Sequence, residues 1–501
     1  MKTLNYKTLE ETGYQGYVLK TAPEKVLQFG AGNFLRAFAD YYIDLANEWA
    51  GFNGKVVLVQ PIPTGPKAAV TDQEGLYTVY LRGSEHGNAV EKQRLISCVS
   101  RCLNPYEPED HDALLELAAS DDLEYIISNT TEAGIAYDPA CAFSDRPSAS
   151  FPGKLTQFLY ERFRAGKPGL VILACELIDD NGGELLRCVN AYIKQWQLPE
   201  AFSRYVNEAC TFCGSLVDRI VPGKVRDPKE KQRLEAQLGY RDELLDVGEL
   251  FGLWVIEGDP SLGDRLPFQK AGLSGEIFVT PDVRPYKQRK VRILNGAHTG
   301  MVPGAYLAGK TIVRDCMEDA DILSFLERML EEEILPHLPM DRAELVSFAA
   351  AVKDRFCNPY VDHALLSIAL NSVSKWRARN LPSLLAYAEA EKKLPPLLVR
   401  SLAMLLAFYT SRLADLTEEG LSAARVTEAG QREAYLIRDE RWILEFFWMR
   451  READPALLVR DVLASEAMWG QDLTQVPGLT EAVTEALTIA RKEGTRALMR
   501  L

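Results

Sequence analysis

The stretch KVRILNGAHTGMVPGAYLAG (290–309) places Lys290, Asn295 and His298 in an otherwise apolar run that is compatible with a helix. At about 100° per residue, an α-helix would hold the three side chains within an arc of about 140°. A buried lysine with a lowered pKa can take a proton from an alcohol or return one to a carbonyl group. An asparagine amide can stabilise an oxygen that gains negative charge, and a histidine can hydrogen-bond substrate hydroxyls. This set predicts a dehydrogenase whose chemistry needs no metal.

A helix without catalytic function fits the same three residues. It would have a solvated lysine, a capping asparagine and a hydrogen-bonded core histidine. The spacing by itself leaves both interpretations open, and the rest of the chain has to decide between them.

A glycine-rich turn follows the first predicted strand, in the sequence Gly30-Ala-Gly32-Asn33-Phe34-Leu35-Arg36. Two glycines between a strand and a helix let the backbone approach a pyrophosphate, and the helix N-terminus offers free N–H groups and a favourable dipole. We therefore expect a dinucleotide at this turn. The residues predicted to bind it belong to the turn, the end of the second strand and the segment after the 124–130 strand: Phe29, Gly30, Ala31, Gly32, Asn33, Phe34, Arg36, Gln60, Asn129 and Thr131.

The choice between NAD and NADP is not settled at the end of the second strand. Leu35 stands in place of the third glycine of the GxGxxG pattern. The second strand ends in KVVLVQPIPTG, where Gln60 and Thr64 replace the acidic residue that normally binds the ribose of NAD.

Short apolar runs alternate with helical patterns in the first half of the chain. Four of these runs are typical of buried parallel strands: 25–30, 55–60, 124–130 and 169–176. Helix-like segments, such as 33–50 and the region around 114–120, lie between them. This order predicts a doubly wound, Rossmann-like α/β domain over residues 1–280. Two further strands, 76–83 and 92–103, are predicted as an insertion into it.

The pattern changes at the turn-rich segment PDVRPYKQ (281–288), which we predict to be the linker. Beyond Lys290 the chain has helical patterns almost throughout, at 321–334, 342–356, 362–379, 397–416, 441–450 and 481–494. Residues 281–501 are therefore predicted to form a mainly α-helical C-terminal domain that carries the substrate-binding and catalytic groups.

The composition excludes several classes of partner. The formal net charge of −14 argues against a nucleic-acid or anionic-membrane surface, because those partners select basic patches. The N-terminus lacks the apolar run of a secretory signal, and no stretch has the length of a charge-free membrane span. The nine cysteines contain one CxxC pair, Cys210 and Cys213, without a second ligand pair. We therefore expect a cytoplasmic protein with reduced thiols and no metal site.

Four stretches together resemble the polyol-specific long-chain dehydrogenase/reductase family: FGAGNFLRAF (29–38), SNTTEAGI (128–135), FGLWVIEGD (251–259) and KVRILNGAHT (290–299). The likeness covers nearly the whole chain, and the Lys-x4-Asn-x2-His element is its most specific part. The resemblance implies that Lys290 is the general acid/base, Asn295 belongs to an oxyanion-stabilising pair and His298 contacts the substrate. The second asparagine of that pair follows the 169–176 strand in the family, and Asn181 is the candidate here. The resemblance also implies NAD as cofactor and a monomer or weak homo-oligomer.

Within the family, SNTTEAGI, FPGKLTQFLYERF (151–163) and RILNGAHT are similar to the branch that interconverts D-tagaturonate and D-altronate with NAD. Such a keto-sugar acid carries a carboxylate, which needs a cationic partner. The candidates are Arg355, His363, Lys375 and Arg377, and Lys375 resembles a lysine near the family's substrate pocket. Fructuronate, mannitol and mannitol 1-phosphate are alternative substrates. A nucleotide-binding protein without catalysis is the alternative from another class.

Overall fold

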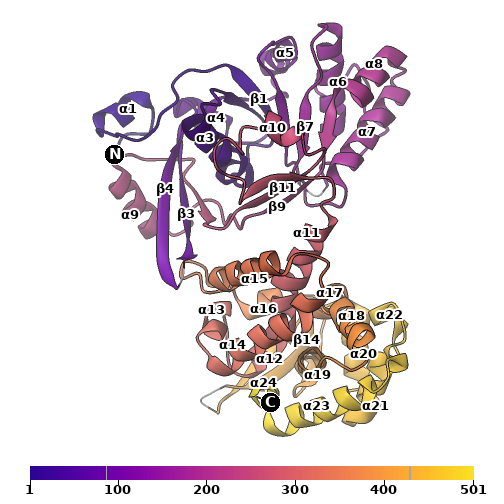
Figure 1. Ribbon diagram of the computed structural model, residues 1–501. Helices are drawn as coiled ribbons and strands as arrows, with labels where there is room; N and C mark the ends of the chain where they lie inside the picture. Colours follow the sequence, from indigo (N-terminus) through magenta and orange to yellow (C-terminus); the bar gives the residue numbers. More distant parts are fainter. Residues whose placement is uncertain (86, 132, 428–429, 501) are drawn as a thin grey trace. The chain divides into compact units, whose positions relative to one another are not determined.

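The computed structural model describes residues 1–85, 87–131, 133–427 and 430–500, and the chain in it divides into two compact units (Figure 1). The first unit comprises Met1–Arg82 and Val90–Val283. The second comprises Gly83–Ala89 and Arg284–Leu501. The second unit's main segment therefore begins inside the 281–288 segment that we predicted as the linker. That segment is largely helical, because α11 (Arg284–Arg289) occupies most of it.

A six-stranded parallel sheet forms the centre of the first unit, in the order β5-β2-β1-β6-β7-β8. Its strands are β1 (Glu24–Phe29), β2 (Lys55–Val59), β5 (Val99–Leu103), β6 (Tyr125–Ser128), β7 (Val171–Ala174) and β8 (Thr211–Cys213). The four parallel strands predicted from the sequence are confirmed. The chain builds outward from β1 through β2 and β5 on one side, and through β6, β7 and β8 on the other. A doubly wound sheet has its ligand-binding crevice where the strand order reverses in this way, here between β1 and β6.

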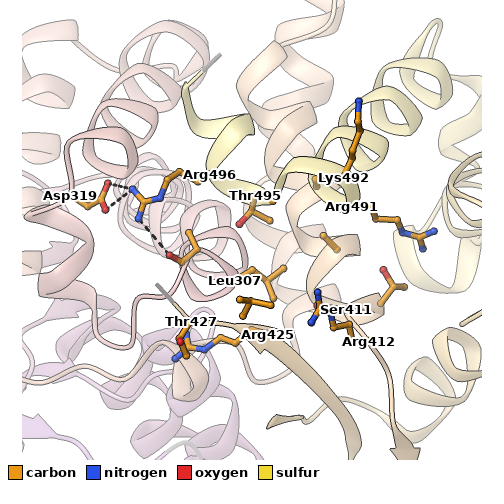
Figure 2. Close-up of a pocket in the computed structure, with 16 residues that line it drawn as sticks. Leu307, Asp319, Ser411, Arg412, Arg425, Thr427, Arg491, Lys492, Thr495 and Arg496 are labelled. Atoms are coloured by element: carbon orange, nitrogen blue, oxygen red, sulfur yellow. Dashed lines mark hydrogen bonds and ion pairs between the residues drawn. The ribbon is translucent and has the colours of Figure 1, made fainter. Parts of the chain in front are cut away.

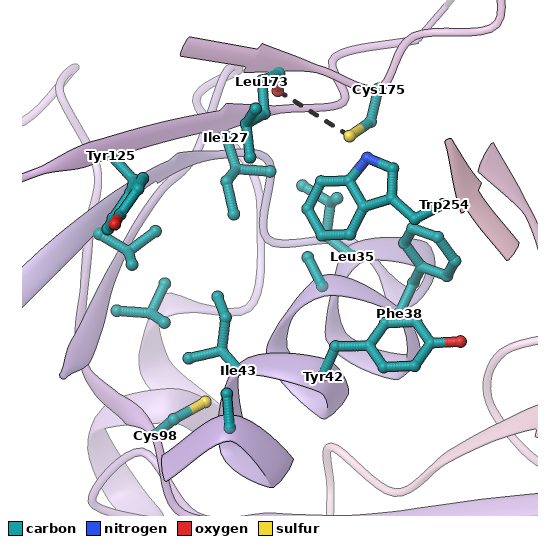
Figure 3. Close-up of a cluster of buried hydrophobic side chains, with 14 of the residues drawn as sticks. Leu35, Phe38, Tyr42, Ile43, Cys98, Tyr125, Ile127, Leu173, Cys175 and Trp254 are labelled. Atoms are coloured by element: carbon teal, nitrogen blue, oxygen red, sulfur yellow. Dashed lines mark hydrogen bonds between the residues drawn. The ribbon is translucent and has the colours of Figure 1, made fainter. Parts of the chain in front are cut away.

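Alternate residues of these strands pack into two hydrophobic cores, one on each face of the sheet, as expected for a sheet that is covered on both faces. Val26 and Ile127 pack with α2 (Asn33–Ala37), α3 (Ala39–Ala50) and Trp254 in one core. Leu27 and Ile126 pack with α5 (Pro108–Leu117), α6 (Phe151–Arg164) and α7 (Asn181–Gln195) in the other. Figure 3 shows the first core, in which Leu35, Phe38, Tyr42 and Ile43 of the helical segment lie beside strand residues and Trp254.

The helix predicted over 33–50 is broken in the structure. α2 and α3 are separated at Phe38, whose backbone leaves the helical region at φ −123° and ψ −80°. The carbonyl of Ala37 accepts a 2.8 Å hydrogen bond from Arg219 Nη1. Because Arg219 lies 182 residues further along the chain, local periodicity does not predict this hydrogen bond.

The predicted strand 92–103 is also wrong as a single element, because it divides into β4 (Asn88–Ile96) and β5. β5 joins the edge of the parallel sheet, whereas β4 belongs to a three-stranded sheet of order β10-β3-β4 with β3 (Tyr77–Glu85) and β10 (Asp246–Glu249). A second small sheet has the order β12-β11-β9, with β9 (Ser215–Asp218), β11 (Leu253–Glu257) and β12 (Ile277–Thr280). The other helices of the unit are α1 (Tyr6–Glu11), α4 (Lys67–Asp72), α8 (Glu200–Arg204), the π-turn η1 (Tyr205–Ala209), α9 (Pro228–Leu238) and α10 (Leu262–Arg265).

The second unit is mainly helical, as predicted. Its helices after α11 are η2 (Lys290–Asn295), α12 (Gly296–Leu307), α13 (Val313–Met317), α14 (Ala320–Arg328), η3 (Met329–Ile334), η4 (Leu335–His337), α15 (Arg342–Phe356), α16 (Leu365–Ile368), α17 (Ser372–Arg379), α18 (Leu381–Glu391), α19 (Pro396–Thr410), α20 (Arg441–Met449), α21 (Pro455–Leu463), α22 (Glu466–Trp469), η5 (Leu473–Gln475), α23 (Leu479–Glu493) and α24 (Thr495–Arg500). In the described chain, no helix is both long enough and apolar enough to cross a membrane.

The second unit also contains a three-stranded antiparallel sheet that was not predicted from the sequence. It consists of β13 (Asp415–Leu416), β14 (Leu421–Val426) and β15 (Arg432–Ile437). The strands LSAARV and REAYLI are rich in alanine, leucine, arginine and glutamate, which are strong helix formers. Pairing with the neighbouring strand overrides this local preference, and Arg425 on β14 spans the pair by donating from Nε and Nη2 to one carboxylate oxygen of Glu433 on β15.

Candidate active site

The glycine-rich turn lies at the carboxyl end of β1, at the reversal point of the sheet. Gly30 adopts φ +125°, and a Cβ atom there would stand 2.7 Å from the carbonyl oxygen of Asn129, so this position accepts only glycine. Gly32 precedes α2 with φ −74°, and a Cβ on it would meet nothing within 4 Å. No side chain caps the first turn of α2. The turn therefore leaves open space and free N–H groups where a pyrophosphate would need them.

Three other predicted dinucleotide residues in this turn have different surroundings. Phe29 and Ala31 are buried in the two cores that flank the sheet, so they shape the turn from beneath. Phe34 is half-buried and stacks on Phe38, with ring centroids 5.0 Å apart.

The carboxyl end of β6 forms the other side of this crevice. The N–H of Asn129 donates to the carbonyl of Phe29, and its side-chain amide donates to the carbonyl of Cys175 at 2.7 Å. Thr131 follows with φ +83°, a conformation that is strongly unfavourable for a β-branched residue. Strain of this kind concentrates at functional sites, because the surrounding structure must hold it in place.

A buried carboxylate that the sequence analysis missed fixes this edge. Glu176 accepts hydrogen bonds from the hydroxyl of Ser128 and from both the N–H and the hydroxyl of Thr130, at 3.0–3.1 Å. Burial raises the pKa of Glu176. Its position two residues after β7 was visible in the sequence, but its partners on β6 were not. It joins the ends of β6 and β7 and so sets the backbone of Asn129 and Thr131.

Arg36 points away from the glycine turn. Its guanidinium is buried and donates to Leu244 O and to Asn33 Oδ1, both at 2.5 Å, and it lies 3.3 Å from a carboxylate oxygen of Asp246. Burial raises the pKa of Asp246 to about 7, although Arg36 opposes the shift. The structure thus places Arg36 and the side-chain oxygen of Asn33 in a network that holds α2 to the start of β10 and the segment before it. The backbone of the turn is left for a ligand.

Gln60, at the end of β2, is buried and accepts a hydrogen bond from the N–H of Lys67 at 2.9 Å. The Lys67 amine contacts the carboxylates of Glu107 and Asp110. Burial acts to lower the pKa of Lys67, but the hydrogen bonds to the two carboxylates outweigh it and raise the pKa. The cation nearest to the end of β2 in this loop is therefore already neutralised.

In the second unit, the segment that carries Lys290 and Asn295 is a π-helical turn, η2, which continues into α12. Hydrogen bonds in a π-turn run from residue i to i+5, so residues five apart lie nearly above one another. The π-turn brings Lys290 and Asn295 closer to one line than the predicted α-helix would have done. His298 follows Asn295 by three residues and shares its face. Single π-turns within α-helices are frequent at functional sites.

Close packing holds α12 in place. A Cβ atom at Gly300 would stand 2.8 Å from Met329 Cε, and one at Gly304 would stand 2.2 Å from Met404 Sδ. The hydroxyl of Ser401 on α19 donates to the carbonyl of Gly300 at 3.1 Å. The glycines in GAHTGMVPGAYL therefore allow neighbouring helices to approach, and the helix that begins with the Lys–Asn–His residues is rigidly anchored.

His298 and Asn295 both have polar atoms without a partner. Nε2 of His298 is buried and makes no hydrogen bond within the described chain, and the same holds for the side-chain amide of the half-buried Asn295. The His298 ring stacks on Phe356 at 4.0 Å between centroids and meets His363 edge-on at 5.3 Å. Burial lowers the pKa of His298 well below its usual value, and the neighbouring His363, Arg355, Arg379 and Lys375 add to the shift. The imidazole is therefore neutral near pH 7.

The structure brings three of the four predicted substrate-binding residues together around His298. Arg355 comes from α15, His363 from the segment before α16, and Lys375 from α17. Lys375 Nζ donates to the carbonyl of Ile368 at 2.9 Å, and burial lowers the pKa of its amine, with a further contribution from Arg379. Arg355 and Lys375 form a cationic cluster in the second unit, and burial lowers the pKa of His363 beside them, which favours its neutral form.

Arg379 belongs to the same cluster and was missed from the sequence. Its Nη1 donates to Thr299 Oγ1 at 3.0 Å, next to His298, and burial lowers its pKa. The signal was its position four residues after Lys375, which places both on one helix face. Arg377, two residues after Lys375, is exposed and lies next to Gly470 instead.

Asn181, the candidate for a second oxyanion donor, lies in the first unit at the start of α7. Its amide donates to the carbonyls of Glu176 and Ser215, and its oxygen accepts from the N–H groups of Gly182 and Ser215, all at 2.9–3.0 Å. All of its hydrogen-bonding groups serve the backbone between β7 and β9. In this arrangement Asn181 is a structural clamp with no free donor.

Comparison with known protein families identifies both halves of the chain. Residues 24–270 match the Mannitol dehydrogenase Rossmann domain, and residues 282–490 match the Mannitol dehydrogenase C-terminal domain. Among curated proteins, the chain is 45% identical over 507 residues to an altronate oxidoreductase from Klebsiella pneumoniae, with 99% of each chain covered. It is 44% identical to altronate oxidoreductases from Yersinia enterocolitica and Escherichia coli, over 98% and 100% of this chain and 99% of theirs.

Two solved structures share the fold over the whole chain. A D-sorbitol dehydrogenase in substrate-free form matches with a TM-score of 0.80 and 21% identity, covering 100% of both chains. The mannitol 2-dehydrogenase of Pseudomonas fluorescens, in a ternary complex with NAD and D-mannitol, matches with a TM-score of 0.64 and 22% identity, covering 100% of this chain and 99% of that one.

The two glycines of the turn should respond differently to the same substitution. Gly30→Ala should lower the melting temperature of the ligand-free protein, because the new Cβ collides with Asn129 O and φ +125° is strained for alanine. Gly32→Ala should leave the melting temperature unchanged but weaken NADH binding at least tenfold, about 1.4 kcal/mol, because the methyl group enters the open space of the turn. Thermal melts and NADH fluorescence titrations measure the two effects. Equal melting temperatures for both variants would contradict the geometry.

Proposed function

Because the chain belongs to the mannitol dehydrogenase family, we propose that it is an NAD-dependent oxidoreductase that interconverts D-tagaturonate and D-altronate in hexuronate breakdown. The full-length relatives named altronate oxidoreductase support this substrate pair. The observation that carries the proposal is the cationic cluster around His298, next to the Lys290 and Asn295 face. A keto-sugar acid presents both a ketone and a carboxylate, and these two features of the second unit match those groups.

Lys290 is the proton donor and acceptor in this proposal. When bound, NADH supplies the hydride that reduces the ketone carbon. The Lys290 ammonium gives a proton to the ketone oxygen as that oxygen gains negative charge, and takes it back from the alcohol in the reverse direction. The side-chain N–H groups of Asn295, which have no partner within the described chain, donate to the same oxygen and stabilise it.

His298 orients the sugar. Its neutral imidazole carries no charge of its own into a region that is already rich in cations. Nε2 is free to hydrogen-bond a substrate hydroxyl, which would satisfy a buried polar atom that otherwise has no partner among the described residues. Phe356 fixes the plane of the ring by stacking on it.

Lys375, Arg355 and Arg379 bind the substrate carboxylate. Their positive charges are concentrated around the half-buried His298, and burial lowers the pKa of both Lys375 and Arg379. An anion in their midst would relieve this unfavourable grouping of cations. A neutral ketose or polyol offers no such compensation, so the cluster favours the sugar acid over fructose and mannitol.

The first unit binds the dinucleotide, in the crevice between Gly30–Gly32 and Asn129–Thr131. The open space at Gly32 and the uncapped start of α2 fit a pyrophosphate. NAD is favoured over NADP, because a 2′-phosphate would need a free cation near the end of β2 and Lys67 is held by Glu107 and Asp110. This preference for NAD does not require the acidic residue that normally binds the ribose at the end of β2.

Lys290→Met should abolish turnover without loss of cofactor binding. We expect kcat for tagaturonate reduction to fall by roughly 10²- to 10⁴-fold, the usual contribution of general acid–base catalysis. The dissociation constant of NADH, measured by fluorescence, should stay as in the wild type. Lys287→Met, one turn earlier, is the matched control and should retain activity. A fully active Lys290→Met enzyme would exclude the proposed proton transfer.

Lys375→Met should reduce selectivity for the acid. Loss of a charge-assisted hydrogen bond costs about 1.5–3 kcal/mol, so the ratio of kcat/KM for tagaturonate to that for fructose should fall roughly 10- to 100-fold. Lys375→Arg should restore part of the ratio, and Arg377→Met, on the other side of α17, should leave it unchanged. The carboxylate assignment fails if Lys375→Met lowers both kcat/KM values equally.

The double variant Glu107→Gln/Asp110→Asn should free Lys67 and shift coenzyme preference. We expect the ratio of the NADPH and NADH dissociation constants to move about tenfold toward NADPH, or about 1.4 kcal/mol. Fluorescence titration of both coenzymes measures the ratio directly, without turnover. Asp112→Asn, on the same helix but paired with Arg146, is the control. An unchanged ratio would show that Lys67 does not set the preference.

A further inference from the structure

A cavity of about 810 Å³ lies in the second unit at the C-terminal end of α12 (Figure 2). Its walls come from the ends of α12, α19 and β14 and from the junction of α23 and α24. His298 lies in the first turn of α12, and Leu307 at the cavity is its last residue, so the helix separates the two by roughly 14 Å. The cavity is therefore distinct from the Lys290 face. Its volume is typical of sites for small molecules.

Positive charge dominates the lining of this cavity. Its five cations are Arg412, Arg425, Arg491, Lys492 and Arg496, and its one acidic residue is Asp319. The chain as a whole has a net charge of −14, so this concave surface has the opposite sign to the protein around it. A cleft lined by one sign of charge concentrates ligands of the other sign.

Two of the cations form a fixed part of the wall. Arg425 is buried, pairs with Glu433 and donates from Nη1 to Tyr306 O and Lys310 O at 2.6 and 2.7 Å. Arg496 pairs with Asp319 at 2.8 Å, a contact drawn in Figure 2. These contacts tie β14 to the end of α12 and α24 to the start of α14, so the cavity is a built feature of the unit.

Arg412 and Arg491 are available to a ligand. Arg412 makes no hydrogen bond or ion pair with any residue that the structure describes. Its backbone adopts φ +46°, an unfavourable conformation for an L-residue with a side chain, and Ser411 fixes it by donating from Oγ to Ala424 O at 2.8 Å. Arg491 donates one hydrogen bond, to Ala453 O at 3.2 Å, and no carboxylate of the described residues lies within ion-pair distance of it.

We propose that this cavity binds a small organic anion with carboxylate or phosphate groups, separately from the substrate and the dinucleotide. Arg412 and Arg491 would bind the anionic groups, because guanidinium groups match both carboxylate and phosphate oxygens. Leu307, Ala407 and Val426 provide apolar surface for the carbon skeleton. Lys492 extends away from the other cations and takes no part (Figure 2).

Calorimetric titration of the full-length chain, saturated with NADH, tests the proposal with two probes at low ionic strength. Citrate represents carboxylates and pyrophosphate represents phosphates, so the comparison distinguishes the two ligand chemistries. We expect at least one probe to bind, and Arg412→Gln/Arg491→Gln to weaken its binding at least tenfold. Arg460→Gln, an exposed arginine elsewhere in the unit, should bind as the wild type does.

Lys375→Met separates this cavity from the cationic cluster. Its binding of the probe should equal that of the wild type if the anion occupies the cavity. Loss of binding in Lys375→Met with retention in Arg412→Gln/Arg491→Gln would overturn the proposal, and so would failure of both probes to bind the wild type. Turnover of tagaturonate is measured separately, so failure here leaves the proposed function unaffected.

A measurement on the wild-type protein avoids dependence on the folding of the double variant. Phenylglyoxal modifies accessible arginines, and peptide mapping gives the rate at each one. Citrate or pyrophosphate should slow the modification of Arg412 and Arg491 but not that of Arg460. Equal rates at all three arginines, with and without the probe, would contradict binding in the cavity.

Discussion

The close approach of the β6 end to the β1 turn is the constraint on which the first unit depends. The carbonyl of Asn129 lies where a Cβ on Gly30 would be, and the N–H of Asn129 donates to the carbonyl of Phe29. This contact brings the ends of β1 and β6 close together at the reversal point of the sheet. Gly32, two residues after Gly30, has open space where its Cβ would be. A doubly wound sheet needs both features, since the crevice must be tight enough to hold a pyrophosphate and open enough to admit it.

Glu176 holds the end of β6 in the position that this close contact requires. Its carboxylate accepts three hydrogen bonds from Ser128 and Thr130, and this buried network holds Thr131 at a positive φ that the residue would not adopt by itself. Asn181 contributes in the same sense, because its amide holds the backbone after β7 to Ser215. Polar groups at this edge therefore act mainly on the backbone, and the backbone provides the binding surface.

The charge around two regions of the second unit is opposite in sign to the net charge of the protein. The chain is strongly acidic, yet its second unit contains a cationic cluster around His298 and a separate cation-lined cavity at the other end of α12. Burial lowers the pKa of His298, the neighbouring cations add to the shift, and the imidazole stays neutral, so that the histidine can offer a hydrogen bond where the lysine and arginines offer charge. α12 supports both regions, and its glycines allow the close packing that holds it in place between them.

Sequence periodicity and composition determined the class of the fold, the parallel strands and the mainly helical second unit. These features arise from local patterns of apolar residues, which the chain carries in its own order. The glycine turn and the spacing of Lys290, Asn295 and His298 are also local features of the sequence. The roles of these three residues and the search for a cationic partner of the substrate carboxylate came from the family resemblance. The broken helix at Phe38, the division of 92–103 and the β13–β15 sheet were missed, since each depends on partners far away in the chain.

Tertiary structure alone decided what most of the polar side chains do. The sequence could place Arg36 in a phosphate-binding turn, but in the structure its side chain points toward Asp246. Every hydrogen-bonding group of the Asn181 side chain is bonded to backbone atoms. The structure also converts the Lys290 segment into a π-turn and adds Arg379 to the cluster. The reason is physical: a polar group takes its role from the partners that burial forces upon it, and those partners are brought together by folding, from positions that the linear sequence does not connect.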